Sequence, residues 1–238
     1  MKLINSTLIA TFKNRPNRFL AEVILNDDKK GKKILLAHVP DPGRLKELLV
    51  PNAAVILRES SNQNRKTKFS LIGVKTGNNW VNIDSMISNR LFNEEYQKIA
   101  FFRDYEIIRS EYTFGKSRFD FFMRNIQTNK QALIEIKSVT LVKNGKALFP
   151  DAPTLRGTKH VNELKDAILQ GYDASIVFII KRNDAYSFSP NKLIDVKFSQ
   201  ALKGAYQSGV HISAVKCLYD PIHKNELCIL EEIPISLE

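Results

Sequence analysis

Three charged residues stand inside two segments that otherwise have the composition of core strands. Asp120 lies in RFDFFM, and Glu135 and Lys137 lie in ALIEIKSV, with the polar turn NIQTNK between the two segments. Side chains alternate between the faces of a strand, so Glu135 and Lys137 share a face, and strands joined by a short turn pair with each other. If the faces match, pairing brings Asp120 beside Glu135. The hairpin is therefore predicted to present two carboxylates and one ammonium on one patch.

These residue types suit a divalent metal ion and a phosphate. Adjacent carboxylates repel each other unless a proton or a cation lies between them. Mg²⁺ or Mn²⁺ is held by carboxylates, water and substrate phosphate, and the carbonyl of Ile136 would add a further oxygen to those of Asp120 and Glu135. Lys137 would orient the attacking water or stabilise the charge that develops on phosphorus. The predicted chemistry is metal-dependent phosphodiester hydrolysis.

The same pattern also fits an ordinary ion-paired surface. Cross-strand pairs contribute only about 0.2–1 kcal/mol each, and Asp…Glu-x-Lys is a short pattern of common residues. Glu111 on the preceding strand would add a third carboxylate, and Arg156 and Lys159 at the start of a predicted helix suit a phosphate. Lys159 equally fits an i,i+4 pair with Glu163, and His160 fits either an acid–base role or a structural one.

The segments from residue 85 onward predict an α/β domain that positions this hairpin. Helices are expected over 85–102, 158–172 and 194–209, with a long loop over 141–157. Strands are expected over 106–114, 117–123, 131–139, 174–180, 211–219 and 226–233. A strand that follows a crossover helix implies a mixed sheet with helices on both faces.

The first 84 residues predict a small β-barrel. Strands are expected over 6–12, 18–25, 33–39, 54–60 and 69–76, with a hairpin loop over 26–33 and a short helix over 40–49. Five strands with one helix between the third and the fourth is the order of an OB-fold, which often binds oligonucleotides.

Charge and composition narrow the class of partner. The 238 residues carry a formal net charge of +11, and residues 1–85 hold 15 basic and 7 acidic side chains. Such an excess favours a polyanion, with nucleic acid as the first candidate, although it also fits a basic protein kept soluble by its charge. Two cysteines without metal-type spacing argue against a disulfide scaffold and a zinc module. The longest apolar run, 176–180, is too short to cross a membrane, so a cytoplasmic protein is expected.

Five motifs resemble those of the sugar fermentation stimulation protein A family. In order they are NRF (17–19), DPGRL (41–45), SRFDF (117–121), IEIKSVTLV (134–142) and FPDAPTLRGTKHVNEL (149–164). The resemblance implies an α+β protein of two domains. An N-terminal OB-fold of residues 1–84 would be joined to a PD-(D/E)XK nuclease-like, mixed-sheet α/β domain of residues 85–238. It also implies a DNA-binding protein linked to sugar-utilisation genes.

Carried over by resemblance, the acidic motif of the nucleases falls on Asp120 and the Glu-x-Lys motif falls on Glu135 and Lys137. Glu111 is the candidate accessory carboxylate, and Phe119 stands where that superfamily often has a proline. The candidates for nucleic-acid contact are Arg15, Arg18, Phe19, Arg44, Arg65, Lys66, Lys68, Arg156 and Lys159.

Three functions remain open from the sequence. They are a Mg²⁺- or Mn²⁺-dependent DNA nuclease, a non-catalytic DNA-binding regulator that keeps the nuclease fold, and a protein that acts on RNA or a nucleotide. The strand at 226–233 is a candidate edge for homo-oligomer formation.

Overall fold

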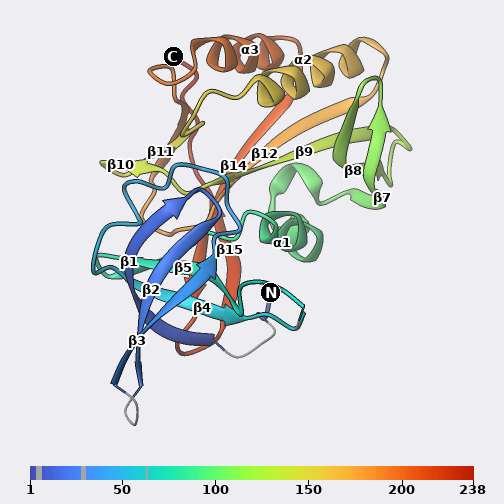
Figure 1. The fold of residues 1–238 in the computed structure, drawn as a ribbon. Helices are drawn as coiled ribbons and strands as arrows, with labels where there is room; N and C mark the ends of the chain where they lie inside the picture. The colour runs from blue at the N-terminus through green and yellow to red at the C-terminus, as the bar shows by residue number, and fades with distance from the viewer. Residues whose placement is uncertain (4–6, 28–30, 63) are drawn as a thin grey trace.

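The fold was analysed in a computed structural model, which describes residues 1–3, 7–27, 31–62 and 64–238. A barrel built from the N-terminal third lies beside a larger sheet that carries the helices (Figure 1). The hairpin loop predicted over 26–33 falls partly on residues 28–30, which lie outside the described residues.

The N-terminal strands form a six-stranded sheet in the order β3-β2-β1-β4-β5-β6. Pairing of β3 with β5, with Ala37 opposite Phe69, closes this sheet into a barrel. The inward side chains, among them Phe12, Val23 and Leu71, form one buried cluster. The predicted barrel is therefore confirmed, with β6 added to the five predicted strands. The strands are β1 (Thr7–Asn17), β2 (Leu20–Asp27), β3 (Gly31–His38), β4 (Ala54–Glu59), β5 (Phe69–Thr76) and β6 (Asn79–Asn82).

The helix predicted over 40–49 is wrong. Leu45 has a φ of +49°, a left-handed conformation that cannot continue into a right-handed helix. A single turn follows, in which the amide of Leu49 donates to the carbonyl of Leu45 at 2.8 Å. Leu45, Leu48 and Leu49 are all buried in the barrel core. Apolar residues at positions i, i+3 and i+4 are expected in a single buried turn as well as in a helix. The spacing of these leucines therefore did not require a helix.

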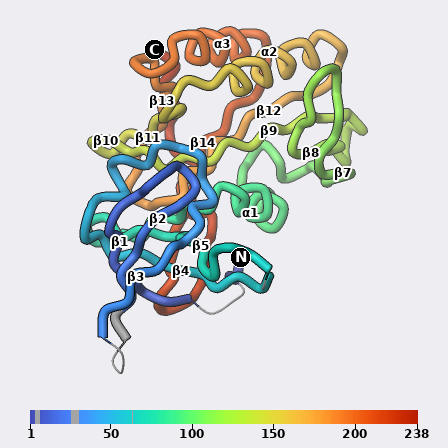
Figure 2. Tube along the Cα trace, viewed as in Figure 1, coloured from blue at the N-terminus to red at the C-terminus, as the bar shows by residue number. Residues whose placement is uncertain are grey.

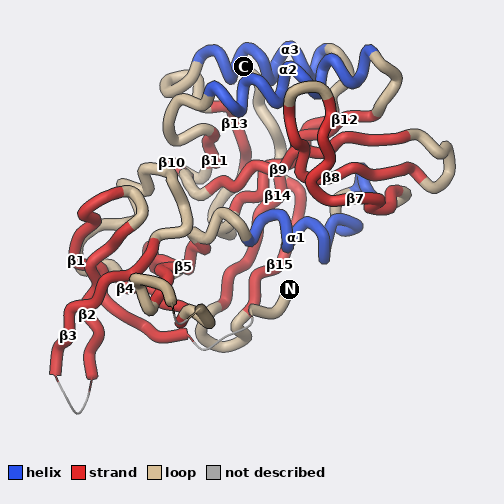
Figure 3. The backbone as a smooth tube through the Cα atoms, turned by 45° about the vertical axis from the view of Figure 1, so that its right-hand side comes forward, coloured by secondary structure: helices blue, strands red, loops and turns tan. Residues whose placement is uncertain are grey.

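The C-terminal domain is built on a mixed six-stranded sheet in the order β15-β14-β12-β9-β8-β7. Strand β12 runs parallel to β9 and to β14, while the outer pairs are antiparallel. Helices α2 and α3 lie side by side on one face and α1 lies on the other (Figures 1 and 3). The predicted architecture is confirmed. The elements are α1 (Ile87–Glu95), α2 (Leu155–Leu169), α3 (Val196–Gln207), β7 (Tyr105–Phe114), β8 (Ser117–Asn125), β9 (Gln131–Val139), β12 (Asp173–Ile180), β14 (His211–Asp220) and β15 (Glu226–Glu232).

Two predicted segments differ in detail. The helix expected over 85–102 is α1 followed by the 3-10 turns η1 (Tyr96–Lys98) and η2 (Ala100–Phe102). The loop expected over 141–157 contains β10 (Val142–Lys143) and β11 (Lys146–Phe149), and β11 pairs with β13 (Ser187–Pro190), which the sequence pattern did not predict. No helix in the described part of the chain has both the length and the apolar composition needed to cross a membrane.

The barrel and the mixed sheet are in direct contact. In Figure 2, β14 extends past the helices toward the barrel. A Cβ on Gly73 of β5 would lie 2.7 Å from the ring of Tyr219 on β14, so only glycine allows this approach. Lys181, which is fully buried, donates to the carbonyl of Asp84 at 2.8 Å. These contacts hold the strand-rich N-terminal part against the domain that carries the predicted site.

Candidate active site

Asp120 lies where β8 and β9 part from each other. The ladder between the two strands starts at the pair Phe121 and Ile134 and does not include Asp120. The amide of Ile136 instead donates to Oδ2 of Asp120 at 2.7 Å. A side chain thus takes the place of a backbone acceptor, and the end of the hairpin stays open.

The regular alternation of side chains along β8 is interrupted at Asp120. Phe119 packs in the cluster under α2 and α3, whereas Phe121 and Met123 pack in the cluster under α1. Residues two apart share a face in a regular strand, so the chain turns between Phe119 and Phe121. This turn brings Asp120 within reach of α1, where Asn89 donates to Oδ1 of Asp120 at 2.7 Å.

Glu135 faces α2 and is almost fully buried. Its Oε1 accepts from Lys137 Nζ at 2.5 Å and lies 2.5 Å from Nδ1 of His160. An ionised carboxylate only accepts hydrogen bonds, so Nδ1 carries the proton in this pair. The second oxygen, Oε2 of Glu135, is buried and has no hydrogen-bond partner among the described residues. One oxygen of this carboxylate is therefore saturated and the other is free for a ligand.

The surroundings shift the pKa values of the two carboxyl groups in opposite directions. Burial raises the pKa of Asp120, and the negative charge of Glu135 raises it further. Burial also acts to raise the pKa of Glu135, but the hydrogen bond from His160 and the charge of Lys137 outweigh it, so the pKa of Glu135 is lowered. The opposed shifts, typical of sites that combine two carboxyl groups, place the negative charge on Glu135 first.

The oxygens at this position fit a hard divalent ion. Asp120 accepts one hydrogen bond on each oxygen and keeps free lone pairs, and Oε2 of Glu135 has no partner. The amide of Ile136 points toward β8, and the carbonyl of a strand residue points to the same side as its amide. Among the described residues no group of three His, Cys, Asp or Glu side chains is arranged to hold a metal ion. Two carboxylates and a carbonyl suit Mg²⁺, which keeps several waters, better than Zn²⁺.

Glu111 does not join the other predicted catalytic residues. It has a φ of +55°, and its Oε2 lies 3.1 Å from Nη1 of Arg118. Both side chains of this ion pair are more than half exposed. The geometry thus makes Glu111 a surface partner of Arg118 and gives no support to its predicted role as accessory carboxylate.

Arg156 and Lys159 line a pocket of about 400 Å³ that also contains His160. The alternative pair of Lys159 with Glu163 is formed at 3.7 Å, and Lys159 also donates to the carbonyl of Lys116 at 2.6 Å. Arg156 and Lys159, which were predicted to suit a phosphate, therefore lie next to His160, which contacts Glu135.

On the barrel, Arg15, Arg18 and Arg44 line a second pocket of about 250 Å³. Arg15 donates to the carbonyls of Arg18, Asp41, Gly43 and Arg44 at 2.6 to 3.1 Å, and burial lowers its pKa. It therefore holds the loop together. Arg18 and Arg44 are exposed, and Phe19, a predicted contact residue, is 51% exposed.

The other predicted barrel residues lie outside this pocket. Arg65 donates to Thr67 at 3.1 Å and to Ser70 at 3.2 Å, which holds its own loop. Lys68 pairs with Glu59 at 3.1 Å, and Lys66 is exposed.

Two residues that contact the carboxylates of Asp120 and Glu135 were not predicted to do so. His160 lies four residues before Leu164 on the buried stripe of α2, and this spacing is a signal that it faces the sheet. Asn89 on α1 has no comparable signal, because only the turn at Asp120 brings it into contact. Asp151, whose role the sequence left open, accepts from the amide of Arg44 at 2.7 Å and so links the barrel loop to the second domain.

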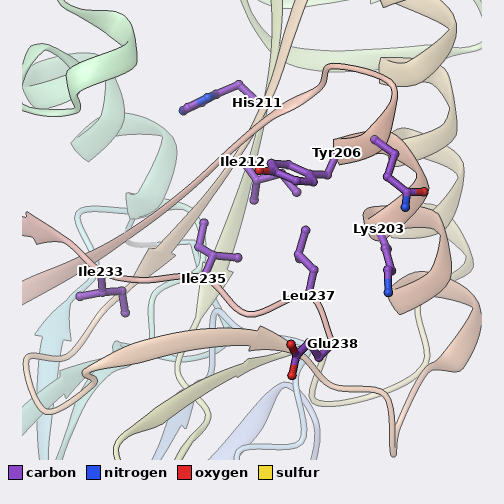
Figure 4. A pocket seen from close by; sticks show the side chains of 9 residues that line it. Lys203, Tyr206, His211, Ile212, Ile233, Ile235, Leu237 and Glu238 are labelled. Atoms are coloured by element: carbon purple, nitrogen blue, oxygen red, sulfur yellow. The ribbon is translucent and has the colours of Figure 1, made fainter.

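A further pocket, of about 610 Å³, lies away from these residues. Tyr206 of α3, Ile212 of β14 and the C-terminal Ile235 and Leu237 surround it (Figure 4). Its lining is mainly apolar, whereas polar groups converge at Asp120 and Glu135.

Comparisons with known proteins cover both domains. A family model described as the SfsA N-terminal OB domain matches residues 14–83, and one described as the sugar fermentation stimulation protein RE domain matches residues 86–223. The chain is 42% identical over 240 residues to a sugar fermentation stimulation protein homolog of Clostridium botulinum (strain Langeland), with all of both chains covered. It is 43% identical over 216 residues to the homolog of Clostridium beijerinckii, covering 91% of this chain and 92% of the relative.

A solved structure of Pyrococcus furiosus SfsA, described as a complex with Ca²⁺, matches with a TM-score of 0.86 at 27% identity and covers 99% of each chain. The matches therefore extend over the barrel and over the domain that holds Asp120 and Glu135. The chain belongs to the sugar fermentation stimulation protein family.

Proposed function

We propose that this protein is a Mg²⁺- or Mn²⁺-dependent nuclease that hydrolyses phosphodiester bonds in DNA. The observation that carries the proposal is the convergence of Asp120, Glu135 and Lys137 at the open end of the β8–β9 hairpin, with Oε2 of Glu135 left without a partner. A buried carboxylate oxygen without a hydrogen bond is costly, and a cation offsets that cost.

The donor set supports a hard cation at this position. Asp120, Glu135 and the carbonyl of Ile136 would hold the ion, which when bound would polarise a phosphate oxygen and a water molecule. The related Pyrococcus furiosus protein is described as a Ca²⁺ complex, and Ca²⁺ takes the same oxygen ligands as Mg²⁺. The description of the matched domain as an RE domain also agrees with a nuclease.

The residues around Asp120 and Glu135 would have separate roles in the reaction. Asn89 and the amide of Ile136 fix both oxygens of Asp120, so its orientation is set before substrate binds. Lys137 would stabilise the negative charge that develops on the phosphate, because its ammonium is held beside Glu135 and its side chain is only 13% exposed. His160 would fix Glu135 through Oε1 and leave Oε2 for the metal.

The barrel would bind the DNA. Arg18 and Arg44 are exposed at one pocket, and the exposed ring of Phe19 lies beside Arg18 in the chain. Cationic side chains with an aromatic ring hold a phosphate backbone and stack on a base. The excess of basic residues in the first 85 positions supports this assignment.

A second candidate is a non-catalytic DNA-binding regulator of sugar-utilisation genes. The observation that favours it is the closed contact of Glu135 with both Lys137 and His160, which balances the buried charge without a metal ion. In this reading the cluster would be structural, and the barrel would do the binding.

A cleavage assay separates the two candidates. Purified protein is incubated with end-labelled single- and double-stranded DNA and RNA in the presence of Mg²⁺, Mn²⁺ or EDTA, beside an Asp120→Asn control. The nuclease proposal expects DNA products that require the metal and disappear in the variant. Binding of DNA without cleavage above the control would instead establish the regulator.

A further inference from the structure

The pocket beside His160 has the construction of an anion site. It lies between the β7–β8 turn, which contributes Lys116, Ser117 and Arg118, and the first two turns of α2, which contribute Arg156 and Lys159. No described residue that lines the pocket is acidic. Two segments separated by some 40 positions thus place four cationic side chains around one hollow of about 400 Å³.

The charge around the pocket is only partly neutralised. Glu111 pairs with Arg118 at 3.1 Å and Glu163 approaches Lys159 at 3.7 Å. These two acids balance two of the four cations. The first turn of α2 adds the positive end of the helix dipole, with the amide of Gly157 donating to Oγ1 of Thr154 at 3.0 Å and the amide of Thr154 donating to Asp195 at 2.8 Å.

Two polar groups inside the pocket are prepared for a ligand. Ser117 is only 7% exposed, lines the pocket, and its Oγ is buried without a hydrogen-bond partner among the described residues. His160 is 3% exposed and also lines the pocket. Because Glu135 holds Nδ1 of His160, Nε2 is the ring nitrogen that remains for a ligand. The pocket therefore has two polar side chains in its wall as well as cations at its rim.

We propose that this pocket binds the terminal phosphate of a nucleic-acid strand. The identity of the strand rests on the proposed function, whereas the phosphate site rests on the pocket itself. Since His160 contacts both the pocket and Glu135, a phosphate held there would lie next to the metal-binding carboxylates. The protein would then act from the end of a strand.

A terminal phosphate fits these donors better than an internal one. A phosphomonoester carries three free oxygens and a charge of about −1.5 to −2 at neutral pH, whereas a diester carries two free oxygens and a single charge. Both ester oxygens of an internal phosphate continue into the strand, which keeps it at the rim. A terminal phosphate is attached to the strand through one oxygen only, so its other oxygens can face several of the four cationic side chains at once.

The test compares strands that differ only at their ends. Fluorescence anisotropy is measured for one labelled DNA sequence with a 5′-phosphate, a 3′-phosphate or hydroxyl ends, in EDTA so that no cleavage occurs. We expect one of the phosphorylated strands to bind about tenfold more tightly than the hydroxyl-ended strand, a difference of about 1.4 kcal/mol.

Three variants locate the effect. Ser117→Ala and Arg156→Ala should reduce the affinity for the phosphorylated strand to that for the hydroxyl-ended strand. Lys165→Ala removes a charge from an exposed position of the same helix that does not line the pocket, and should keep the difference. Equal affinity for all ends in the wild type, or a preference that survives both pocket substitutions, would overturn the proposal.

Titration with inorganic phosphate separates this proposal from the proposed function. Binding that is lost in Arg156→Ala, with no binding of any oligonucleotide, would keep the phosphate pocket and refute a nucleic-acid substrate. The assignment of the pocket to a strand end would fall in that case. Absence of phosphate binding together with equal affinity for all DNA ends would refute the pocket alone and leave the DNA-binding function standing.

Discussion

Two pairs of carboxylates in this protein have different surroundings and different tasks. At the junction of the domains, Asp41 accepts from the amide of Gly43 at 2.7 Å and Asp151 accepts from the amide of Arg44 at 2.7 Å. At the centre, Asp120 also accepts from a backbone amide, but Oε2 of Glu135 has no described partner. The first pair holds a loop of the barrel, whereas the second leaves one carboxylate oxygen without a described partner.

The comparison shows that the two pairs of carboxylates differ in their hydrogen-bond donors. A buried carboxylate needs donors, and backbone amides satisfy it at a fixed distance that positions the chain. A Cβ on Gly43 would lie 2.7 Å from Asp151 and 2.8 Å from Asp41, so only glycine lets the loop approach both carboxylates this closely. The centre combines an unsatisfied oxygen with a lysine and a histidine, which is the arrangement that chemistry requires.

The largest effect is expected when the DNA-cleavage rate of Asp120→Asn is compared with that of Asp151→Asn. The loss in Asp120→Asn should exceed the 10- to 100-fold that removal of an outer partner of a metal ligand typically costs. Asp151→Asn keeps an acceptor for the amide of Arg44 and should retain most activity. Rates measured on the same labelled duplex with Mg²⁺ decide the point. Comparable losses in both variants would remove the distinction between the two pairs.

The second-largest effect is expected on the free energy of unfolding, which should fall in the Glu135→Gln variant. Loss of the charge leaves Lys137 and His160 without their anionic partner, and breaking a buried pair in this way costs about 3–5 kcal/mol. Urea unfolding at pH 7 measures the cost. A variant as stable as the wild type at pH 7 would show that the contacts of Glu135 contribute nothing to folding.

The pH dependence of that cost follows from the lowered pKa of Glu135. The stabilisation is complete above the unfolded value of 4.5 and is lost as the pH falls through the lower folded value. The difference in unfolding free energy between the wild type and Glu135→Gln should therefore narrow in acid. A difference that stays constant from pH 7 to pH 3 would contradict the lowered pKa.

A smaller loss of stability is expected at the junction. Asp151→Ala removes the acceptor of the Arg44 amide and should lower the unfolding free energy by about 1–2 kcal/mol, the range for one hydrogen bond to a charged group with partial exposure. Asp166→Ala, at an exposed position of α2, is the matched control and should leave stability unchanged. Equal effects in the two variants would show that the junction contact does not hold the loop.

The smallest effect separates the two kinds of arginine in the barrel pocket. Arg44→Ala should reduce the slope of log affinity against log salt by about 0.9 if it contacts one phosphate of duplex DNA. Arg15→Ala should lower stability instead, because four carbonyls lose their donor. Lys192→Ala, an exposed site on the other domain, serves as the charge control. An unchanged slope in Arg44→Ala would exclude this residue from the contact surface.

Much of the fold follows from local patterns in the sequence. Period-two and period-3.6 spacing predicted the barrel, the mixed sheet and the crossover helices, because each depends on burying one face of an element. The predicted helix over 40–49 failed because Leu45 adopts a left-handed conformation that apolar spacing does not reveal. Strands β6 and β13 are short; β6 pairs with the preceding strand β5, whereas β13 forms only through pairing with the distant strand β11.

The centre was predicted only in part, for a related reason. Asp120, Glu135 and Lys137 stand on adjacent strands of one hairpin, so their proximity follows from a local turn. Asn89 comes from α1 and His160 from α2, on opposite faces of the sheet, and only the packed domain brings them to the two carboxylates. The prediction for Glu111 also needed the fold, because a left-handed residue redirects its side chain toward Arg118.

The amino-acid sequence alone determines the family, the order of the strands and helices, and the presence of two carboxylates and a lysine on one hairpin. These properties depend on local spacing and on motifs that can be recognised without coordinates. The tertiary structure decides which oxygen of Glu135 remains free, which arginine is committed to backbone carbonyls, and that Ser117 and His160 share a pocket with four cations. These properties depend on contacts between residues far apart in the chain, whose free energy exists only when the whole domain is packed.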